Sequence, residues 1–262
     1  MRCALLTIGS GPIAVQSYAT LKELVDLKCV VLSRKSSRQP VLTVIREFGV
    51  WYVFQTMLSI LTNRIRRQRL SPAEIELDGV RIVVWSGRDD ETQVLDSLRE
   101  LEVEFVLVCG FRHILRRPII DATKFCFNLH ASLLPAYRGP EPIVWGLLCH
   151  EKKFGITIHE VDEMIDQGDI VAQGEVTRPA LPLQAVVESK LSRIVPDLLG
   201  KVVRDMNAGK LLRRKQGKGT YLPAPSYANR KLKGVLMTDN PWRVSSHPRH
   251  GYSLVDSTRD VK

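Results

Sequence analysis

Cys3-Ala4-Leu5-Leu6-Thr7-Ile8-Gly9-Ser10-Gly11-Pro12 follows the first two residues of the chain and decides how its fold begins. Residues 3–8 are mostly apolar and end at a glycine, which is the pattern of a short buried β-strand. Residues 13–24 then carry apolar side chains at helical spacing. The sequence therefore predicts a strand that turns directly into a helix.

The same alternation continues through the first half of the chain. Short apolar runs at residues 28–32, 80–84 and 105–108 predict further strands, and residues 92–101 have the spacing of a helix. Strands that alternate with helices form parallel sheets with helices on both faces. We therefore predict an α/β fold built on a Rossmann-like, mostly parallel sheet.

Two segments lie outside this regular alternation. Residues 41–69 predict one or two helices inserted between units of the sheet, and residues 71–74 (Ser-Pro-Ala-Glu) restart the chain like a capping box. Residues 183–199 and 201–206 are predicted to be helical, with a break at Pro196.

The composition changes near residue 207. We expect residues 1–206 to form one domain and residues 207–262 to form a basic, partly irregular extension. Proline, serine, glycine and asparagine recur there, and we expect a partly disordered tail after Pro248. Basic side chains cluster at its start, at Lys210, Arg213, Arg214, Lys215 and Lys218.

The charge of the chain narrows the choice of partners only slightly. The 262 residues carry 38 Lys and Arg against 28 Asp and Glu, a formal net charge of +10. Such a surface attracts anions, including nucleotides, folate carboxylates, nucleic acid and anionic membranes. A basic surface that simply faces solvent is the equally simple alternative.

Cysteine usage and hydropathy exclude several classes of protein. None of the five cysteines forms a CxxC pair, so we predict buried free thiols and no structural zinc. The apolar opening run is too short for a secretory signal, and we expect a cytoplasmic protein. The longest uncharged stretch, residues 48–63, is shorter than the ~20 residues of a membrane span. A core or interface helix, or a helix lying on an anionic membrane, fits this stretch.

The chemistry concentrates in Phe127-Asn128-Leu129-His130-Ala131-Ser132-Leu133-Leu134-Pro135-Ala136-Tyr137-Arg138-Gly139. Asn128 and His130 are two residues apart, so at a strand end both side chains point to one face. An amide donor stabilises an oxyanion, and an imidazole that titrates near neutral pH handles a proton. Acyl transfer to an amine needs both, and residues 162–169 supply carboxylates. A hydrogen-bonded structural pair is the alternative that the residues alone leave open.

Three matched stretches decide between these alternatives. Residues 128–139, then 155–159 (Gly-Ile-Thr-Ile-His), then 162–169 resemble the signature of the folate-dependent formyltransferase superfamily. The resemblance is strong over residues 106–173. It implies a catalytic domain at residues 1–206, Asn128, His130 and Asp166 as its catalytic set, 10-formyltetrahydrofolate as formyl donor, and no metal.

The resemblance also implies which residues form the binding walls. Folate is expected against the pocket segment that begins at Gly110 and against the acidic loop. Gly9-Ser10-Gly11 resembles a phosphate loop at a helix N-terminus, although a plain strand-to-helix turn fits equally. Arg138 either binds a substrate phosphate or anchors its loop, and His159 is expected to be packing. The predicted folate-binding residues are Phe111, His113, Ile114, Leu115, Asp162 and Glu163, and the predicted substrate-binding residues are Gly9, Ser10, Gly11, Tyr137 and Arg138.

The acceptor amine is the least defined part of the prediction. An amino sugar linked to a nucleotide ranks first, because Tyr137-Arg138-Gly139-Pro140-Glu141-Pro142 with Trp145 resembles the sugar-modifying branch. Methionyl-tRNA ranks second, because those enzymes carry a sizeable C-terminal barrel for which the extension is too short. Glycinamide ribonucleotide, a deformylase that uses water, and an inactive folate-binding module follow. A homodimer is expected by analogy with sugar-modifying relatives.

Overall fold

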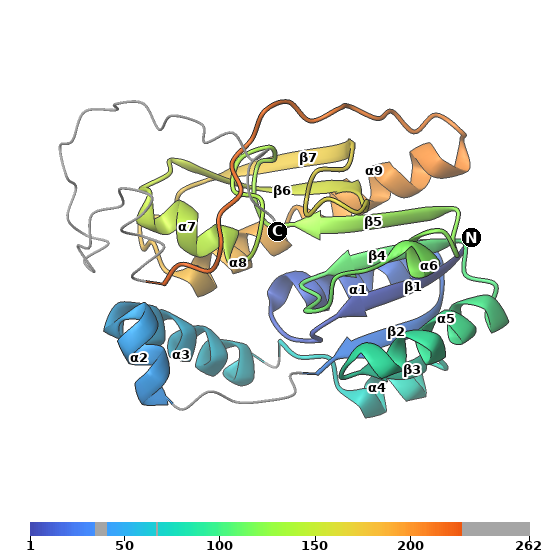
Figure 1. The fold of residues 1–262 in the computed structure, drawn as a ribbon, viewed down its shortest axis with the longest axis horizontal. Helices are drawn as coiled ribbons and strands as arrows, with labels where there is room; N and C mark the ends of the chain where they lie inside the picture. Colours follow the sequence, from blue (N-terminus) through green and yellow to red (C-terminus); the bar gives the residue numbers. More distant parts are fainter. Residues whose placement is uncertain (35–40, 67, 227–262) are drawn as a thin grey trace.

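The computed structural model describes residues 1–34, 41–66 and 68–226. One seven-stranded sheet runs through the molecule in the order β3-β2-β1-β4-β5-β6-β7 (Figure 1). Strands β1 to β5 are parallel, whereas β6 is antiparallel to both β5 and β7. The strands are β1 (Arg2–Thr7), β2 (Asp26–Ser33), β3 (Arg81–Trp85), β4 (Phe105–Cys109), β5 (Phe125–His130), β6 (Lys153–Glu160) and β7 (Ile170–Thr177).

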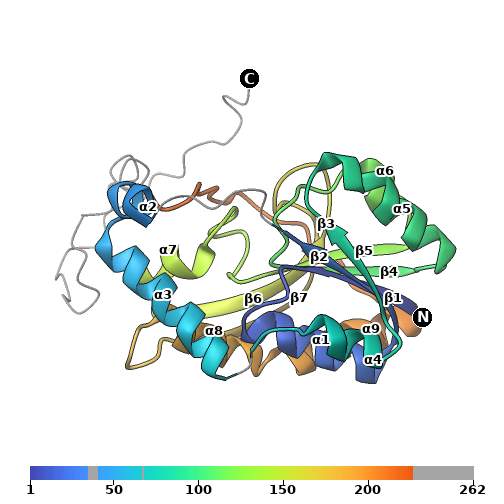
Figure 2. The ribbon, with the colours of Figure 1, turned by 90° about the horizontal axis from the view of Figure 1, so that it is seen from below.

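Helices cover both faces of the sheet, as the turned view shows (Figure 2). One face is covered by α1 (Pro12–Leu24), α4 (Pro72–Leu77), α8 (Gln184–Ser192) and α9 (Val195–Asn207). The opposite face carries α5 (Glu91–Glu100) and α6 (Arg117–Ile120). A 3₁₀ turn, Arg88–Asp90, precedes α5, and α7 (Pro142–Leu148) lies between β5 and β6. The predicted α/β class is confirmed.

Alternating side chains of the central strands fill a separate core on each face. In β1, Leu5 belongs to the core beneath α1, α8 and α9, while Ala4 and Leu6 belong to the core beneath α5 and α6. Both faces of a strand at the centre of a covered parallel sheet are dry, which explains the continuous apolar run. Phe127 and Leu129 of β5 pack into the first core, so Asn128 and His130 are left for the other side.

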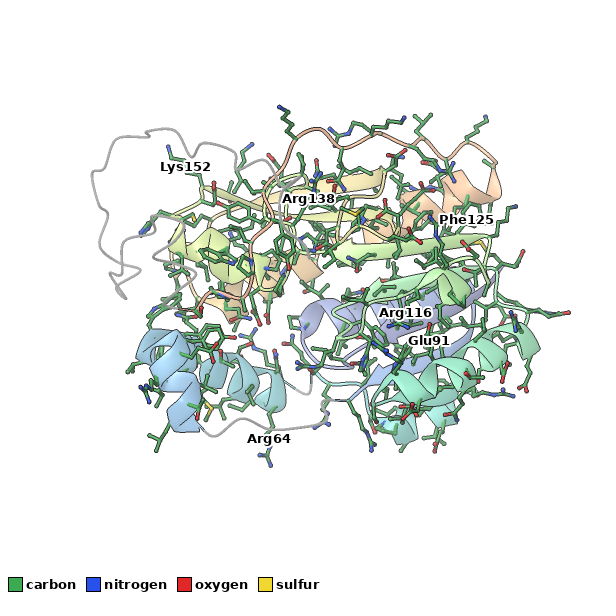
Figure 3. The ribbon with its side chains drawn as sticks, in the orientation of Figure 1. Arg64, Glu91, Arg116, Phe125, Arg138 and Lys152 are labelled. Carbon is green, nitrogen blue, oxygen red and sulfur yellow. The ribbon has the colours of Figure 1, made fainter. Side chains whose placement is uncertain are left out.

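The insertion predicted at residues 41–69 consists of two helices, α2 (Val41–Phe48) and α3 (Val50–Ile65). Its outer face is unusually apolar, with Phe54, Met57, Leu61 and Ile65 all more than half exposed. Arg64 of α3 projects away from the molecule (Figure 3). No helix in the described part of the chain is long and apolar enough to span a membrane.

Two local predictions need correction. The first predicted C-terminal helix ends at Ser192, and α9 begins at Val195, before Pro196. Proline has no N–H and is tolerated in the first helical turn, so Pro196 starts the second helix and does not break the first. Ser71 does precede α4, but its side chain makes no capping hydrogen bond.

The first part of the C-terminal extension packs against the sheet domain. Arg214 pairs with Ile170 at the start of β7, and Tyr221 pairs with Arg138. Trp145 of α7 donates a hydrogen bond from Nε1 to the main-chain oxygen of Pro223 at 2.8 Å. The predicted disordered tail after Pro248 lies outside the described residues.

Candidate active site

A cavity of about 650 Å³ opens at the carboxyl ends of β1, β4 and β5. The chain moves outwards from β1 to β2 and β3 and then returns to β4 on the other side of β1. Ligands of open α/β sheets bind at such a reversal of strand order, because the loops on either side diverge and leave a crevice. Ile8 after β1, the segment after β4 and the end of β5 all line this cavity.

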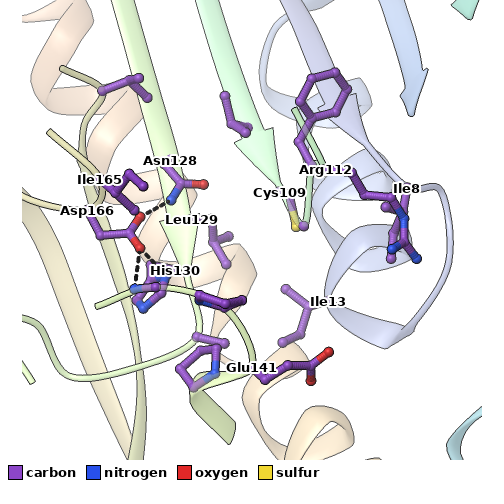
Figure 4. Close-up of a pocket in the computed structure, with 18 of the residues that line it drawn as sticks. Ile8, Ile13, Cys109, Arg112, Asn128, Leu129, His130, Glu141, Ile165 and Asp166 are labelled. Carbon is purple, nitrogen blue, oxygen red and sulfur yellow. Dashed lines mark hydrogen bonds and ion pairs between the residues drawn. The ribbon is translucent and has the colours of Figure 1, made fainter. Parts of the chain in front are cut away.

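Asn128 and Asp166 meet at one wall of the cavity (Figure 4). Asn128 Nδ2 lies 3.1 Å from Asp166 Oδ1 and 3.1 Å from Nε2 of His159. A carboxylate only accepts hydrogen bonds, so the contact with Asp166 fixes which end of the amide is nitrogen. The amide nitrogen of Asn128 therefore faces Asp166 and His159 of the protein, where the sequence had suggested a donor directed at an oxyanion.

His130 lies beside the same carboxylate, and the residue is 7% exposed. Its Nε2 lies 2.8 Å from the main-chain oxygen of Tyr137, and its Nδ1 lies 3.6 Å from Asp166 Oδ2. A carbonyl oxygen accepts, so the neutral ring carries its proton on Nε2. Nδ1 is then the position that can take up a proton next to Asp166.

Charge and burial set the protonation states of this pair. Burial alone raises the pKa of Asp166, but its contacts with His159, His130 and the main-chain N–H of Gly139 outweigh this and lower the pKa to about 2. Burial lowers the pKa of His130, and the neighbouring Asp166 charge only partly opposes that effect. At neutral pH the site therefore holds an ionised carboxylate beside a neutral imidazole.

The loop that carries Asp166 is held by hydrogen bonds from two directions. Asp166 has a positive φ of 54°, an uncommon conformation for a residue with a side chain. Its Oδ2 accepts the main-chain N–H of Gly139 at 2.8 Å, and its main-chain oxygen accepts Nε2 of Gln216 at 3.0 Å. The same Gln216 nitrogen also lies 2.7 Å from the oxygen of Gly168.

All six residues predicted to bind folate line the cavity, namely Phe111, His113, Ile114, Leu115, Asp162 and Glu163. His113 stacks on Trp85, with ring centroids 5.4 Å apart and an interplanar angle of 11°. Ile114 is 70% exposed, so this wall presents an apolar surface to the opening. The acidic loop of Asp162 and Glu163 forms another part of the cavity lining.

The residues predicted to bind the substrate divide into two groups. Ser10 and Gly11 line the cavity, but Gly9, Tyr137 and Arg138 are not part of its wall. The main-chain N–H of Gly9 is bonded to Thr7 Oγ1. The N–H of Gly11 is bonded to the oxygen of Gln68, and Pro12 has no N–H. Much of the expected phosphate loop is therefore already occupied by the protein itself.

Tyr137 and Arg138 point into the protein. The Tyr137 hydroxyl lies 2.6 Å from Glu151 Oε1, and burial raises the pKa of Tyr137. Arg138 is 5% exposed, and its guanidinium donates to Gln216 Oε1 and to the main-chain oxygen of Gly217. Of the two roles considered for Arg138, the geometry favours the anchoring of the loop.

Several cavity residues were not anticipated from the sequence. His159, expected to be packing, contacts both Asn128 and Asp166. Its position in β6 opposite Asn128 follows from antiparallel pairing, which the sequence does not reveal. Gln184 and Glu188 of α8 also line the cavity, and no role there was expected for them from the sequence. Arg112 lies in the segment that was expected to form the pocket wall, and Tyr221, for which a place in the acceptor-site wall or in a simple loop was considered, lines the cavity. Among the described residues, no group of three or more His, Cys, Asp or Glu side chains could hold a metal ion.

The fold is an α/β sheet domain, and its cavity holds a buried Asn–His–Asp cluster at the carboxyl end of β5. Residues 28–186 match the family model described as "Formyl transferase". The chain belongs to the formyl transferase family.

A curated relative is similar in sequence to this chain. The chain is 32% identical over 162 residues to the methionyl-tRNA formyltransferase of Clostridium beijerinckii, covering 62% of this chain and 50% of the relative. The chain thus spans about half the length of that curated relative.

Two solved structures share the fold at low sequence identity. Glycinamide ribonucleotide transformylase 1 from Symbiobacterium toebii superposes with a TM-score of 0.60 at 17% identity, covering 83% of this chain and 94% of that one. HypX from Aquifex aeolicus in complex with tetrahydrofolic acid gives 0.60 at 12% identity, covering 88% of this chain and 31% of that one.

Proposed function

We propose that this chain transfers a formyl group from 10-formyltetrahydrofolate to a primary amine. The observation that carries the proposal is the cluster of Asn128, His130 and Asp166 at the end of β5, in a cavity whose other wall is the segment after β4. Membership of the formyl transferase family supports the reaction class. A protein of the same fold binds tetrahydrofolic acid, which supports the donor.

The proposed reaction begins with attack of the neutral amine on the formyl carbon. As the new C–N bond forms, the carbonyl oxygen becomes an oxyanion and the amine nitrogen must lose a proton. Nδ1 of His130 is the free proton acceptor, and the nearby Asp166 carboxylate stabilises the imidazolium that results. The bond between the formyl carbon and N10 of the folate then breaks, and the proton passes to N10, which gives tetrahydrofolate and the formamide.

Asn128 has a positioning role in this scheme and a stabilising one. Its amide nitrogen holds Asp166 in place, and its oxygen points away from that carboxylate (Figure 4). The oxygen is available to accept a hydrogen from the attacking amine and to orient the lone pair of that amine. If the amide exchanges its contact with His159 for the oxyanion, the same nitrogen stabilises the developing charge.

The acceptor we propose first is an amino sugar carried on a nucleotide. The sequence of residues 137–142 resembles the sugar-modifying branch of the family, and the net charge of +10 favours a diphosphate at the protein surface. Methionyl-tRNA is the second candidate, because the curated relative from Clostridium beijerinckii is a methionyl-tRNA formyltransferase. The basic surface would also serve that substrate through phosphate contacts.

The test measures tetrahydrofolate release from 10-formyltetrahydrofolate with a panel of amines and a control without amine. The panel contains nucleotide-linked amino sugars, methionyl-tRNA and glycinamide ribonucleotide. Release that depends on a sugar nucleotide supports the proposal in full, and release with another amine keeps the reaction and replaces the acceptor. Release without amine makes the protein a deformylase. Folate binding without release in any sample contradicts the proposed transfer to these amines.

A tRNA acceptor has a separate signature. Binding through phosphate contacts weakens steeply with salt, so tRNA affinity should fall as ionic strength rises. A tRNA affinity that is absent or insensitive to salt rules out the second candidate.

A further inference from the structure

A second group of polar side chains lines the cavity beside the Asn128–His130–Asp166 cluster. It contains Glu141, which directly precedes α7, and Glu188 on α8. Figure 4 shows the Glu141 carboxylate next to Ile13 and apart from the Asp166 carboxylate. The proposed formyl transfer assigns no role to either glutamate.

The inserted helix α3 supports both carboxylates from behind. Three polar residues at helical spacing, positions 52, 55 and 59, lie on one face of α3 and face α7 and α8. The contacts are Tyr52 Oη to Glu141 Oε1 at 3.5 Å, the main-chain N–H of Gln184 to Gln55 Oε1 at 3.0 Å, and Ser59 Oγ to Glu188 Oε2 at 3.3 Å. The polar face of this helix is turned inwards and its apolar face outwards.

Gln55 joins the insertion to the cavity wall. Gln184 is the first residue of α8, so its main-chain N–H has no acceptor within the helix, and Gln55 supplies one. Gln55 is 2% exposed, and its amide Nε2 has no hydrogen-bond partner among the described residues. A buried amide donor without an acceptor is uncommon in proteins, and this one lies directly behind Gln184 of the cavity wall.

Both carboxylates keep hydrogen-bonding capacity free for a ligand, Glu141 most of it and Glu188 about half. An ionised carboxylate accepts about four hydrogen bonds. Within the described residues, Glu141 accepts one long bond from Tyr52, and Glu188 accepts from Ser59 and from Gln184 Nε2 at 2.9 Å. The remaining lone pairs require donors, because the cavity wall removes these groups from much of the bulk water.

The charge of the cavity argues against a phosphate inside it. Its lining holds five acidic residues, Glu141, Asp162, Glu163, Asp166 and Glu188, and Arg112 as its arginine. The chain as a whole has the opposite sign, with a net charge of +10. The N–H groups of Gly9 and Gly11 are already bonded within the protein. An anionic part of the acceptor is therefore expected outside the cavity, against the basic surface.

We propose that Glu141 and Glu188, held by the inserted helix α3, bind the hydroxyl groups of the acceptor sugar and so select a polyhydroxylated amine. This inference rests on the proposed formyl transfer to an amino sugar and adds the groups that recognise its ring. Carboxylates accept bidentate hydrogen bonds from neighbouring hydroxyls, as they do from ribose in dinucleotide sites. The amine of the sugar is then left to face His130.

The protonation of the pair is consistent with a ligand that supplies donors. Burial raises the pKa of Glu141, with Arg112 and Tyr52 opposing the shift. Burial also raises the pKa of Glu188, and the charge of Glu141 adds to that shift. Hydroxyl donors from a bound sugar compensate for the lost water and make it easier for both groups to remain ionised.

The experiment measures binding directly, so that it does not depend on turnover. Ligand-observed NMR gives the Kd of D-glucosamine, of cyclohexylamine, which has a ring and an amine without hydroxyls, and of 1,4-diaminobutane, which has a second cationic group. Each is measured with the wild-type chain and with Glu141→Gln and Glu188→Gln, with and without saturating tetrahydrofolate. Glu47→Gln, an exposed acid on α2 of the same insertion, is the matched control.

The proposal expects glucosamine to bind at least about tenfold more tightly than cyclohexylamine, the effect of one or two good hydrogen bonds. Glu188→Gln and Glu141→Gln should each remove most of this preference, while Glu47→Gln and the affinity for tetrahydrofolate remain within twofold of wild type. Equal affinities for glucosamine and cyclohexylamine, a preference that survives both substitutions, or tighter binding of the diamine overturns the proposal. Failure of tetrahydrofolate to bind the wild-type chain would instead contradict the proposed function, and the sugar preference would still test the carboxylate pair.

Discussion

Arg138, which is buried, and Gln216, which is half-buried, form a pair in which Nε and Nη2 of the arginine donate to a single oxygen, Gln216 Oε1, at 3.1 and 2.9 Å. The amide nitrogen of the same glutamine donates to the main-chain oxygens of Asp166 and Gly168. Gln216 therefore joins the strand-end loop that carries Arg138 to the acidic loop that carries Asp166. Through Gln216 the C-terminal extension thus contributes to the shape of the candidate site, and Tyr221 of the same extension lines the cavity.

Gln216→Leu tests this connection. The substitution removes the acceptor of a buried guanidinium and two donors to the acidic loop, which should lower the free energy of unfolding by about 1–3 kcal/mol. We expect kcat to fall about tenfold because Asp166 is less well positioned. Denaturant unfolding and steady-state kinetics measure the two effects. Arg138→Leu combined with Gln216→Leu should cost less than the sum of the single changes, since each removes the same pair. Strict additivity would show that the two side chains act independently.

His130→Ala tests the proton acceptor. Because Nδ1 of His130 is the available base beside Asp166, its loss should lower kcat by about 10²–10⁴-fold. Folate contacts lie mainly on the segment after β4, so folate affinity should stay within a few-fold of wild type. Single-turnover formyl transfer and a folate titration separate the two effects. Unchanged turnover would contradict the assignment of His130.

The pH dependence follows from the two lowered pKa values. A folded pKa below the unfolded value means that the unfolded state binds more protons, so the associated stability is present at higher pH and lost as pH falls. The stability that His130 contributes is lost below pH 6.5, as the pH passes through its lowered pKa. The stability that Asp166 contributes is lost between about pH 4 and pH 2. The free energy of unfolding should therefore decrease towards acid in two stages.

Activity should follow the first of these stages, because His130 must be neutral to accept a proton. The acid limb of kcat/KM is expected to have its midpoint below 6.5. Asp166→Asn removes the charge that partly supports the imidazolium, so it should move the midpoint lower still and reduce kcat. A midpoint above 6.5 in the wild-type chain would contradict a buried, neutral His130.

The sequence was most informative where a local pattern determines a local structure. The apolar runs predicted the parallel strands, and the two-residue spacing of Asn128 and His130 predicted that both side chains leave β5 on one face. Asp166 was assigned by family resemblance, and the structure brings it within hydrogen-bonding distance of Asn128. The strand and side-chain predictions depend on short-range geometry, which the spacing of residues along the chain determines.

The sequence was least informative where a contact depends on packing between distant segments. His159 was expected to be packing, but the antiparallel register of β6 places it opposite Asn128. The insertion was predicted as helices, yet nothing in its sequence shows that Gln55 caps α8. The sequence around Arg138 is compatible with phosphate binding and with anchoring of the loop. The contact with Gln216 in the structure distinguishes the two roles. Strand register and helix docking depend on contacts across the whole fold, so they are not read from local sequence patterns alone.

Gly139→Ala tests the turn that delivers a main-chain N–H to Asp166, and it has an internal control in Gly79→Ala. Gly139 has φ +98°, and a Cβ built there would lie 2.5 Å from the main-chain oxygen of Leu222. Gly79 also has positive φ, at +71°, but a Cβ there meets nothing within 4 Å. Gly79→Ala should therefore cost only the strain of a left-handed residue, about 1 kcal/mol. Gly139→Ala adds a clash with the main-chain oxygen of Leu222. Main-chain atoms cannot relieve a clash by changing rotamer, so the chain segment at Leu222 must move.

The two substitutions should differ in function as well as in stability. The N–H of Gly139 is 2.8 Å from Asp166 Oδ2 and helps to lower the pKa of that carboxylate. When the turn is displaced, Asp166 loses this donor and its pKa should rise towards the ordinary value. We expect Gly139→Ala to lower kcat and to change how the free energy of unfolding depends on pH between about 4 and 2, while Gly79→Ala leaves kcat unchanged and lowers the stability by the same amount at every pH. Thermal unfolding across pH 2–7 and single-turnover kinetics distinguish these outcomes. Equal effects of the two substitutions would mean that Gly139 matters only for its backbone conformation, and that the contact with Asp166 is incidental.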